Sequence, residues 1–392
     1  MALPQSPCHS TLAARFHDSI DAIDAAAWDA LAGEGNPFVS HAFLGGLERC
    51  GCIRPEWGWQ PHHLTLHRAD GSLAAAAPLY LKGNSHGEYV FDWNWAGAWE
   101  RAGGAYYPKL LCAVPYSPVP GPRLLVGDAG DGVALRAALA RAMRERAWSL
   151  GLSSVHANFL IEADLDGFDG EWLARFDWQY HWHNRDYGGF DDFLAALRHK
   201  KRKNIRQERA TVAASGLDCT MQRADALDAD ELATVHALYL ATFDEKGNHA
   251  TLTLEFFRHL AAQFGEAMQL ALARRAGQIV AMALFLRGGD TLYGRYWGSR
   301  EQVPGLHFEL CYYLGIDHAI ARRLQRFEPG AQGRHKLARG FLPSRTRSRH
   351  AIAPPALRAA VAEALRHEAA ALEHVGEELL AHSPYAHGDR AP

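Results

Sequence analysis

The sequence lacks several features that would place a protein in a common class. No run of about 18 apolar residues occurs, so no membrane-spanning helix is expected. The segment before Phe16 has no charged start followed by an apolar core, so it does not resemble a secretory signal. The six cysteines are scattered, without paired C-x-x-C motifs, which argues against a zinc site or a disulfide framework. We therefore expect a cytoplasmic protein.

The motifs of several enzyme classes are also missing. The sequence contains no H-E-x-x-H, no G-x-S-x-G, no P-loop and no dinucleotide-binding G-x-G-x-x-G. Its 22 histidines form no compact set of ligands with cysteine or aspartate, so no metal is expected. The formal net charge is only -3, so bulk charge indicates neither a nucleic acid nor a membrane surface as partner. Only a local cluster of charged residues can indicate such a partner.

An internal repeat is the most informative feature that is present. The 392 residues exceed the roughly 250–300 residues that one hydrophobic core usually serves. Residues 64–81 and 270–287 align without a gap, and each copy has two alternating segments around a glycine, the pattern of a β-hairpin. A helix precedes each copy, and Ser40 would cap the first of these helices and Thr253 the second. We therefore predict a duplicated unit; coincidence between two amphipathic patterns is the alternative.

Helices and strands are predicted to alternate along the rest of the chain, which indicates a mixed α/β fold. Helices are expected at 131–150, 171–176, 191–214, 305–324 and 355–382, and strands at 154–160, 179–185 and 291–298. The expected domains are 1–185, 186–352 and a C-terminal part, 353–392, in which a helix is followed by a disordered tail after His382.

The densest basic cluster is the segment RHKKRKNIRQER, from Arg198 to Arg209. On a helix its cations would cover most of the surface outside one apolar side, and such a surface attracts phosphate groups. Crowding of like charges costs stability, which favours a functional reason for the cluster, although a solvated helix face is the alternative. The candidate donor- or phosphate-binding residues are Lys200, Arg202, Lys203 and Arg206.

A second candidate segment is FEPGAQGRHKLARGFLP, from Phe327 to Pro343. Its glycines let the backbone approach a ligand closely, and it brings a possible base together with two cations. An ordinary connection between a helix and a strand is the alternative. The candidate residues are Gly333, His335 and Arg339 for binding the donor and Lys336 for catalysis.

A third segment, GRYWGSREQVPGLHFELCYY, begins at Gly294 and runs from a strand through a turn into a helix. A helix start of this kind can bind a pyrophosphate with unpaired N–H groups, but the usual Q/R-x-x-G-x-G/A signature is missing. His307 and Glu309 are candidates for acid–base catalysis, unless they merely cap or flank the helix.

A fourth segment, residues 85–110, places Glu88 and Asp92 four residues apart among many aromatic residues. Aromatic walls with a few polar groups suit the recognition of a sugar or peptide, and a carboxylate there can have a raised pKa and accept a proton. Glu88 and Asp92 are therefore candidate catalytic residues, unless the segment is a core cluster with surface carboxylates. The candidate acceptor-binding residues are Tyr89, Trp95, Tyr106, Tyr107 and Lys109.

Together, these segments resemble a bacterial family of peptidoglycan biosynthesis or recognition proteins. The phrases that carry the resemblance are NPFVSHAFLGGLE, SHGEYVFDWNWA, YYPKL, KKRKNIRQER, GRYWG, LHFELCYY and EPGAQGRHKLARGFLP, which span residues 36–350. The family is similar to Fem proteins, so the resemblance implies two tandem acetyltransferase-like (GNAT-type) domains, each a mixed sheet flanked by helices. It further implies an acceptor site facing the first domain and a reaction centre near Lys336–Phe341.

The resemblance implies transfer of an acyl or aminoacyl group to an amine of a peptidoglycan precursor. The donor would be aminoacyl-tRNA or acyl-CoA, with no permanently bound cofactor; the inserted arm that some Fem members use on tRNA is missing. Asp92, Glu88 or His307 would act as base, and Lys336 and Arg339 would stabilise negative charge. We expect a groove with carboxylates on one wall and cations on the other. A coenzyme A-dependent N-acetyltransferase and a non-catalytic protein that recognises cell-wall precursors or RNA are the alternatives.

Overall fold

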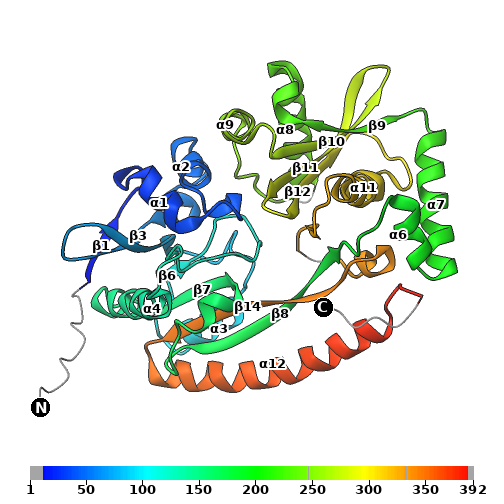
Figure 1. Ribbon diagram of the computed structural model, residues 1–392. Helices are drawn as coiled ribbons and strands as arrows, with labels where there is room; N and C mark the ends of the chain where they lie inside the picture. The colour runs from blue at the N-terminus through cyan, green and yellow to red at the C-terminus, as the bar shows by residue number, and fades with distance from the viewer. Residues whose placement is uncertain (1–11, 246, 332, 387–392) are drawn as a thin grey trace, which may run out of the picture.

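The computed structural model describes residues 12–245, 247–331 and 333–386, and Figure 1 shows the course of the chain. Cys8, the N-terminal segment before residue 12, and residues 387–392 lie outside the described ranges. Each half of the chain forms an α/β unit, and one large sheet runs through both units. The predicted mixed α/β class, with a mixed sheet flanked by helices, is confirmed.

The strands of the first half are β1 (Ala13–His17), β2 (Trp59–Pro61), β3 (His63–His67), β4 (Leu73–Ala77), β5 (Leu79–Lys82), β6 (Lys109–Cys112), β7 (Ser154–Leu160) and β8 (Leu173–His183). Those of the second half are β9 (Asp218–Arg223), β10 (Met268–Arg275), β11 (Gln278–Gly288), β12 (Thr291–Ser299), β13 (Arg326–Glu328) and β14 (Leu342–Ile352). The helices are α1 (Ala25–Ala32), α2 (His41–Arg49), α3 (Trp93–Arg101), α4 (Gly132–Ser149), α5 (Glu162–Leu165), α6 (Phe190–Ala196), α7 (His199–Ala214), α8 (Ala229–Glu245), α9 (Leu254–Phe264), α10 (Leu306–Phe308), α11 (Leu314–Ala321) and α12 (Pro355–Ala381).

The predicted duplication is present in the backbone. The hydroxyl of Ser40 accepts a hydrogen bond from the amide three residues later and caps α2, and the hydroxyl of Thr253 caps α9 in the same way. An antiparallel hairpin follows each helix, β3–β4 after α2 and β10–β11 after α9. The turns contain Gly71 and Gly277, which have φ values of 87° and 82° that suit glycine.

The two units exchange their last strands. In the described part of the chain, the main sheet has 11 strands in the order β2-β5-β6-β7-β14-β8-β13-β12-β11-β10-β9. β6 pairs in parallel with β7, and β12 pairs in parallel with β13, at matching places in the two units. However, β14 lies between β7 and β8, and β8 lies between β14 and β13. Each unit is therefore completed by the final strand of the other, and the boundary at 185/186 stays a prediction.

The C-terminal helix α12 covers the exchanged strands β8 and β14, as Figure 1 shows. Its first turns bury Leu357, Val361 and Leu365 against Trp95 and Tyr106 of the first unit. Burial of side chains of this kind contributes about 1.5–3 kcal/mol each relative to leaving them exposed. The predicted final helix is thus confirmed, and it holds the two units together.

Three sequence predictions differ from the structure. Residues 171–176 do not form a helix; β8 begins there because its residues pair with β14. The helix predicted over 191–214 is divided into α6 and α7, because the backbone of Leu197 bridges to Tyr385 and the amide of Arg198 donates to Pro384 O at 2.8 Å. The tail predicted to be disordered after His382 is thus wrong for residues 383–386, which pack on the second unit, where the Tyr385 hydroxyl donates to Gly340 O at 2.8 Å.

Two general properties follow from the described residues. None of their helices combines the length and the apolar character that a crossing of a membrane requires. Within the same ranges, no group of three or more His, Cys, Asp or Glu side chains is arranged to hold a metal ion.

Candidate active site

A cleft of about 530 Å³ opens where β12 and β13 part. The two strands pair only from Thr291 to Tyr293, opposite Arg326 to Glu328. Beyond these residues β12 continues beside β11, whereas β13 ends at Glu328, because the next residue, Pro329, has no N–H to continue a ladder. Both units line the opening, the first with Tyr89, Phe91 and Pro118 and the second with His307, His335 and Lys336.

Lys336 belongs to the wall of this cleft and is 2% exposed. It lies on a 3-10 turn, Arg334–Arg339, and its Nζ donates to Gly330 O at 2.7 Å and to Ala331 O at 2.9 Å. Burial lowers the pKa of Lys336 to about 7, so the amine is poised between its charged and neutral forms. Gly333 precedes the turn with a φ of 118°, and a Cβ there would lie 2.6 Å from the His335 ring.

Three rings form a cluster on the same wall. The His335 Nε2 lies 2.9 Å from the Tyr312 hydroxyl, and the His307 ring lies 5.4 Å from the Tyr312 ring in an edge-on contact. Partial burial, together with the neighbouring cations Arg339 and Lys336, lowers the pKa of His335, although the residue remains exposed to the solvent. A neutral imidazole beside an amine of low pKa can accept a proton near neutral pH.

Tyr312 is a cleft residue that the sequence analysis missed, for a definable reason. His307 and Tyr312 are five residues apart, which places them on different faces of an α-helix. Residues Glu309–Tyr313 form a π-helical turn between α10 and α11, and a π-helical turn brings residues five apart onto one face. No periodic pattern in the sequence reveals such a turn. Phe91, also missed, lies inside the aromatic segment already singled out.

Two other predicted site residues lie outside the lining of this cleft and connect it to α7. The Arg339 guanidinium donates to Glu208 Oε1 at 2.7 Å and to the Tyr313 hydroxyl at 2.9 Å. Glu309 forms an ion pair of 3.0 Å with Arg209, and burial raises its pKa. These pairs fix the basic helix against the turn that carries Lys336. Arg339 and Glu309 thus hold the wall rather than form its surface.

The cations of α7 are not brought to the cleft. Lys200, Lys203 and Arg206 are exposed, and none of them is among the residues that line the cleft. Arg202 is half-buried and donates to Ala195 O at 3.3 Å. Of the predicted donor-binding residues, His335 therefore lines the cleft, Gly333 and Arg339 lie beside it, and the four cations of α7 lie on the outer helix.

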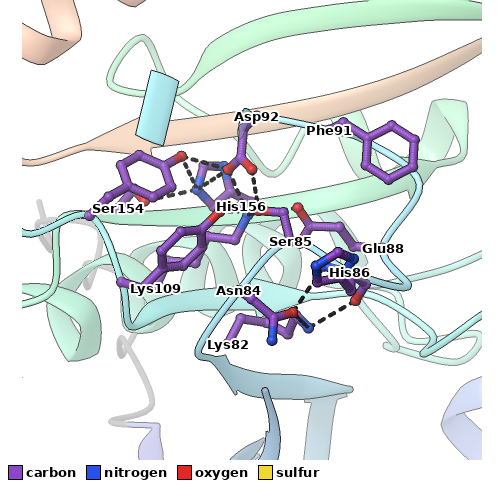
Figure 2. Close-up of polar contacts among 12 residues, drawn as sticks. Lys82, Asn84, Ser85, His86, Glu88, Phe91, Asp92, Lys109, Ser154 and His156 are labelled. Atoms are coloured by element: carbon purple, nitrogen blue, oxygen red, sulfur yellow. Dashed lines mark hydrogen bonds and ion pairs between the residues drawn. The ribbon is translucent and has the colours of Figure 1, made fainter. Parts of the chain in front are cut away.

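The predicted catalytic carboxylates lie in a buried cluster of the first unit, which Figure 2 shows. The Lys109 ammonium donates to Asp92 Oδ2 at 2.6 Å, to Glu88 Oε1 at 2.7 Å and to Ser85 Oγ at 3.0 Å. Asp92 and Glu88 are each 2% exposed, and Lys109 is 1% exposed. The expected groove, with these carboxylates on one wall and cations on the other, is therefore not formed.

The two carboxyl groups of this cluster have pKa values that are shifted in opposite directions. Burial would raise the pKa of Asp92, but the Lys109 ammonium and His156 outweigh it and hold that pKa well below its usual range. Burial raises the pKa of Glu88 to about 7, although Lys109 opposes the shift. Glu88 Oε2 is buried and has no hydrogen-bond partner among the described residues. A carboxylate as tightly paired as Asp92 is a poor base for an amine.

The predicted acceptor-binding aromatics mostly enclose this cluster instead of the cleft. The Tyr106 hydroxyl donates to Asp92 Oδ2 at 2.5 Å, the Tyr107 hydroxyl lies 2.7 Å from Ser85 Oγ, and Trp95 packs on the His350 ring. Tyr89 is the exception, because it lines the cleft with a φ of 59°. Glu88 and Asp92 therefore anchor the loop whose tip, Tyr89 to Phe91, reaches the cleft.

Comparisons with known proteins agree with this architecture. The family model for FemAB-like proteins, described as peptidoglycan biosynthesis/recognition, matches residues 19–387. No curated protein matches the sequence significantly.

Among solved structures, FemX is similar at 13% sequence identity with a TM-score of 0.51, covering 87% of this chain and 98% of FemX. The C-terminal domain of a putative lysylphosphatidylglycerol synthetase from Agrobacterium fabrum is similar at 13% identity with a TM-score of 0.52. The match covers 88% of this chain and 96% of that domain. L-PGS from Bacillus licheniformis has 12% identity and a TM-score of 0.50, and the match covers 87% of this chain and 97% of L-PGS. These structures share the fold. The chain belongs to the FemAB-like family of peptidoglycan biosynthesis and recognition proteins.

Proposed function

We propose that this protein transfers an activated acyl or aminoacyl group to an amine of a peptidoglycan precursor. The observation that carries the proposal is the cleft between β12 and β13, where Lys336 and His335 of the second unit face a space that Tyr89 and Phe91 of the first unit also line. A donor and an acceptor that enter from the two units would meet there, and holding two reactants together supplies much of the catalysis of such a transfer.

The donor would lie along the edge of β12. Within the described residues, β12 pairs with β13 only over Thr291–Tyr293, so the next residues present backbone groups to the cleft on that side. An extended chain with amide groups can bind such an edge by adding hydrogen bonds in the manner of a strand. The pantetheine arm of an acyl-CoA has this chemistry, and the exposed cations of α7 favour a tRNA as the alternative carrier.

The transfer itself needs a base and a group that stabilises negative charge. His335, whose pKa is lowered and whose ring is held by Tyr312, would accept the proton of the attacking amine. An ammonium group has three N–H donors, and Lys336 uses two of them on Gly330 O and Ala331 O. The third would donate to the oxygen of the tetrahedral intermediate. No covalent enzyme intermediate is required, because esters and thioesters are already activated.

The acceptor would enter from the first unit. Tyr89, Phe91 and Pro118 line that side of the cleft, and aromatic walls suit the sugar or peptide part of a cell-wall precursor. The amine of the acceptor would then point toward His335. In this proposal Glu88, Asp92 and Lys109 position the loop that carries Tyr89 and do not take part in proton transfer.

The test is turnover by the purified full-length protein with two labelled donors, acetyl-CoA and aminoacyl-tRNA, and muropeptide amines as acceptors. We expect a labelled amide product with one of the two donors. The same assay with Lys336→Ala should show no product above background. Binding of the muropeptide without turnover of either donor, and unaffected by Lys336→Ala, would instead support a recognition protein.

A further inference from the structure

A second pocket lies on the exchanged strands, beside the cleft. It has a volume of about 130 Å³, and its floor is formed by β8 and β14. Ser348 of β14 is part of this floor, opposite Arg175 of β8 in the strand register. Tyr89, Phe91 and Ala331 line both this pocket and the cleft, so the two spaces are neighbours. The pocket plays no part in the function proposed above.

Ser348 is the end of a chain of hydrogen bonds that runs into the first unit. Its Oγ lies 2.9 Å from His350 Nε2, as expected for side chains two residues apart on one face of a strand. His350 Nδ1 lies 2.6 Å from His156 Nδ1, and His156 Nε2 lies 2.8 Å from Ser154 Oγ. Asp92 Oδ2 lies 3.7 Å from the same His156 nitrogen, which is an electrostatic contact and not a hydrogen bond. The side chains of Ser348, His350, His156 and Asp92 are each 1–3% exposed. The hydrogen bonds thus join a hydroxyl in a pocket to two imidazoles, and a buried carboxylate lies beside the second imidazole.

The Asp92 carboxylate determines which side chain donates and which accepts in each of these hydrogen bonds. Asp92 is ionised, and its charge favours the proton of His156 on Nε2, from which His156 donates to Ser154 Oγ. His156 Nδ1 must then accept, and His350 Nδ1–H donates to it, because only one of two facing nitrogens can hold the proton. His350 Nε2 is left with its lone pair toward the Ser348 hydroxyl. We assign this tautomer because it is the arrangement of a base that can take a proton from serine.

Both imidazoles are held neutral, as this assignment requires. Burial lowers the pKa of His156 to about 3, with Lys109 acting in the same direction. Burial also lowers the pKa of His350 well below its usual value, and His156 and Arg175 add to the effect. Arg175 therefore lies close enough to His350 for its positive charge to lower the pKa of that imidazole. Arg175 also lines the pocket, and its guanidinium pairs with Glu368 at 2.7 Å and donates to Phe91 O at 2.9 Å, which ties β8 to the loop that carries Phe91.

We propose that Ser348 is a nucleophile that accepts small acyl groups from activated esters or thioesters, with His350 as its base. Ser348 Oγ attacks the acyl carbonyl carbon while its proton passes to His350 Nε2. The bond to the leaving oxygen or sulfur then breaks, and His350 returns the proton to that atom, which leaves an acyl ester on Ser348. Water deprotonated by His350 releases the carboxylic acid and restores the hydroxyl. The size of the pocket and its Phe91, Phe159 and Trp178 walls select a short acyl chain.

The test uses p-nitrophenyl acetate with the full-length protein. We expect a burst of p-nitrophenolate close to one equivalent, and a single acetyl group on the peptide that contains Ser348 by mass spectrometry. Ser348→Ala should remove both signals, and Ser348→Cys should retain acylation. Ser344→Ala is the matched control, since Ser344 lies on the same strand outside the pocket lining. Acetylation at another residue, or no burst from natively folded protein, overturns the proposal.

The roles of the partners can be separated from simple structural support. His350→Gln should slow acylation by roughly 10²–10⁴-fold, the usual contribution of a general base. Asp92 is a positioning residue here, so Asp92→Asn should slow acylation, whereas Asp164→Asn, at a buried carboxylate outside the pocket lining, should not. Equal effects of Asp92→Asn and Asp164→Asn on the acylation rate would contradict the tautomer assignment.

Discussion

Phe43 and Phe256 occupy the same position in the two repeated helices, and their rings meet edge to face with centroids 5.5 Å apart. Each is the residue whose amide donates to the capping hydroxyl three residues earlier. The duplicated units therefore contact one another through equivalent residues, as expected when two copies are related by a pseudo-twofold axis. Phe43 is 4% exposed and Phe256 is 1% exposed, so the contact is part of the core.

This contact leads to a first prediction about stability. Phe256→Ala should lower the free energy of unfolding by about 3–5 kcal/mol, because a large buried side chain leaves a cavity. Phe43→Ala should have an effect of similar size, and the double variant should cost less than the sum by about 0.5–1.5 kcal/mol. Urea unfolding checks all three. Val133→Ala, at a site 58% exposed, is the control and should change stability by under about 0.5 kcal/mol.

The helix starts and hairpins of the repeat were predictable because they are local. Ser40 and Thr253 identify helix starts through a hydrogen bond that spans three residues, and a glycine in a short turn between two alternating segments identifies a hairpin. The break at Leu197 was not predictable, because its cause is Tyr385, about half the chain away. A pattern within a short window carries no information about such a partner.

A second prediction concerns the buried cluster. Lys109→Met removes the ammonium shared by Glu88 and Asp92 and leaves two carboxyl groups buried without it. Breaking a buried ion pair in this way typically costs about 3–5 kcal/mol. Removing the partly exposed pair of Arg144 with Asp169, by Arg144→Ala, should cost less than about 1 kcal/mol. Equal losses in urea unfolding would mean that the cluster is not a stabilising core.

Glu88 gives a third prediction, which concerns pH. Burial raises the pKa of Glu88 to about 7, above the value of about 4.3 in an unfolded chain. The stability that this shift provides is complete below the unfolded pKa and is lost as the pH rises toward 7. Glu88→Gln does not titrate, so its stability relative to the wild type should increase by up to about 1.4 kcal/mol per pH unit across that range.

Unfolding curves between about pH 5 and 7 measure this difference. Burial lowers the pKa of Lys82 to about 7, so the contribution of Lys82 changes above this range and does not interfere. The lowered pKa of Asp92 places its titration below the range. A difference between Glu88→Gln and the wild type that stays constant with pH would show that Glu88 is already ionised in the native protein.

The fourth prediction tests Lys336 as the group that stabilises the oxyanion. Lys336→Met should lower kcat of the proposed transfer by roughly 10²–10³-fold, the usual cost of losing one such donor, with little change in the KM of the acceptor. Arg334→Ala is the control, since Arg334 lies on the same turn but is exposed. The pKa of Lys336 is about 7, so the charged donor is lost, and kcat of the wild type should fall, as the pH rises above 7.

The fifth prediction distinguishes the two donors. Replacing Lys200, Lys203 and Arg206 by glutamate should weaken the binding of aminoacyl-tRNA. It should also reduce the slope of log K against the logarithm of the salt concentration by about two to three. Acetyl-CoA, which would bind in the cleft, should be unaffected. The same reversal at Arg141 and Arg144 of α4 is the control. Equal weakening by both sets would show that tRNA has no specific contact with α7.

The candidate site was predictable only in part. The segments that hold Lys336, His335 and Tyr89 stood out by composition, and these residues do line one cleft. Glu88 and Asp92 stood out in the same way, but composition does not reveal that Lys109, 17 residues after Asp92, pairs with both of them. Whether a carboxylate faces a substrate or an ammonium depends on tertiary packing.

The exchange of β8 and β14 also indicates how such a chain can arise. Two identical smaller proteins that swapped their terminal strands would form a homodimer with these pairings, and fusion of duplicated genes would convert it into one polypeptide. In such a chain, neither unit can separate from the other without breaking the ladders on both sides of β8 and β14. Separation of the two units is therefore excluded as a route by which substrates enter the cleft.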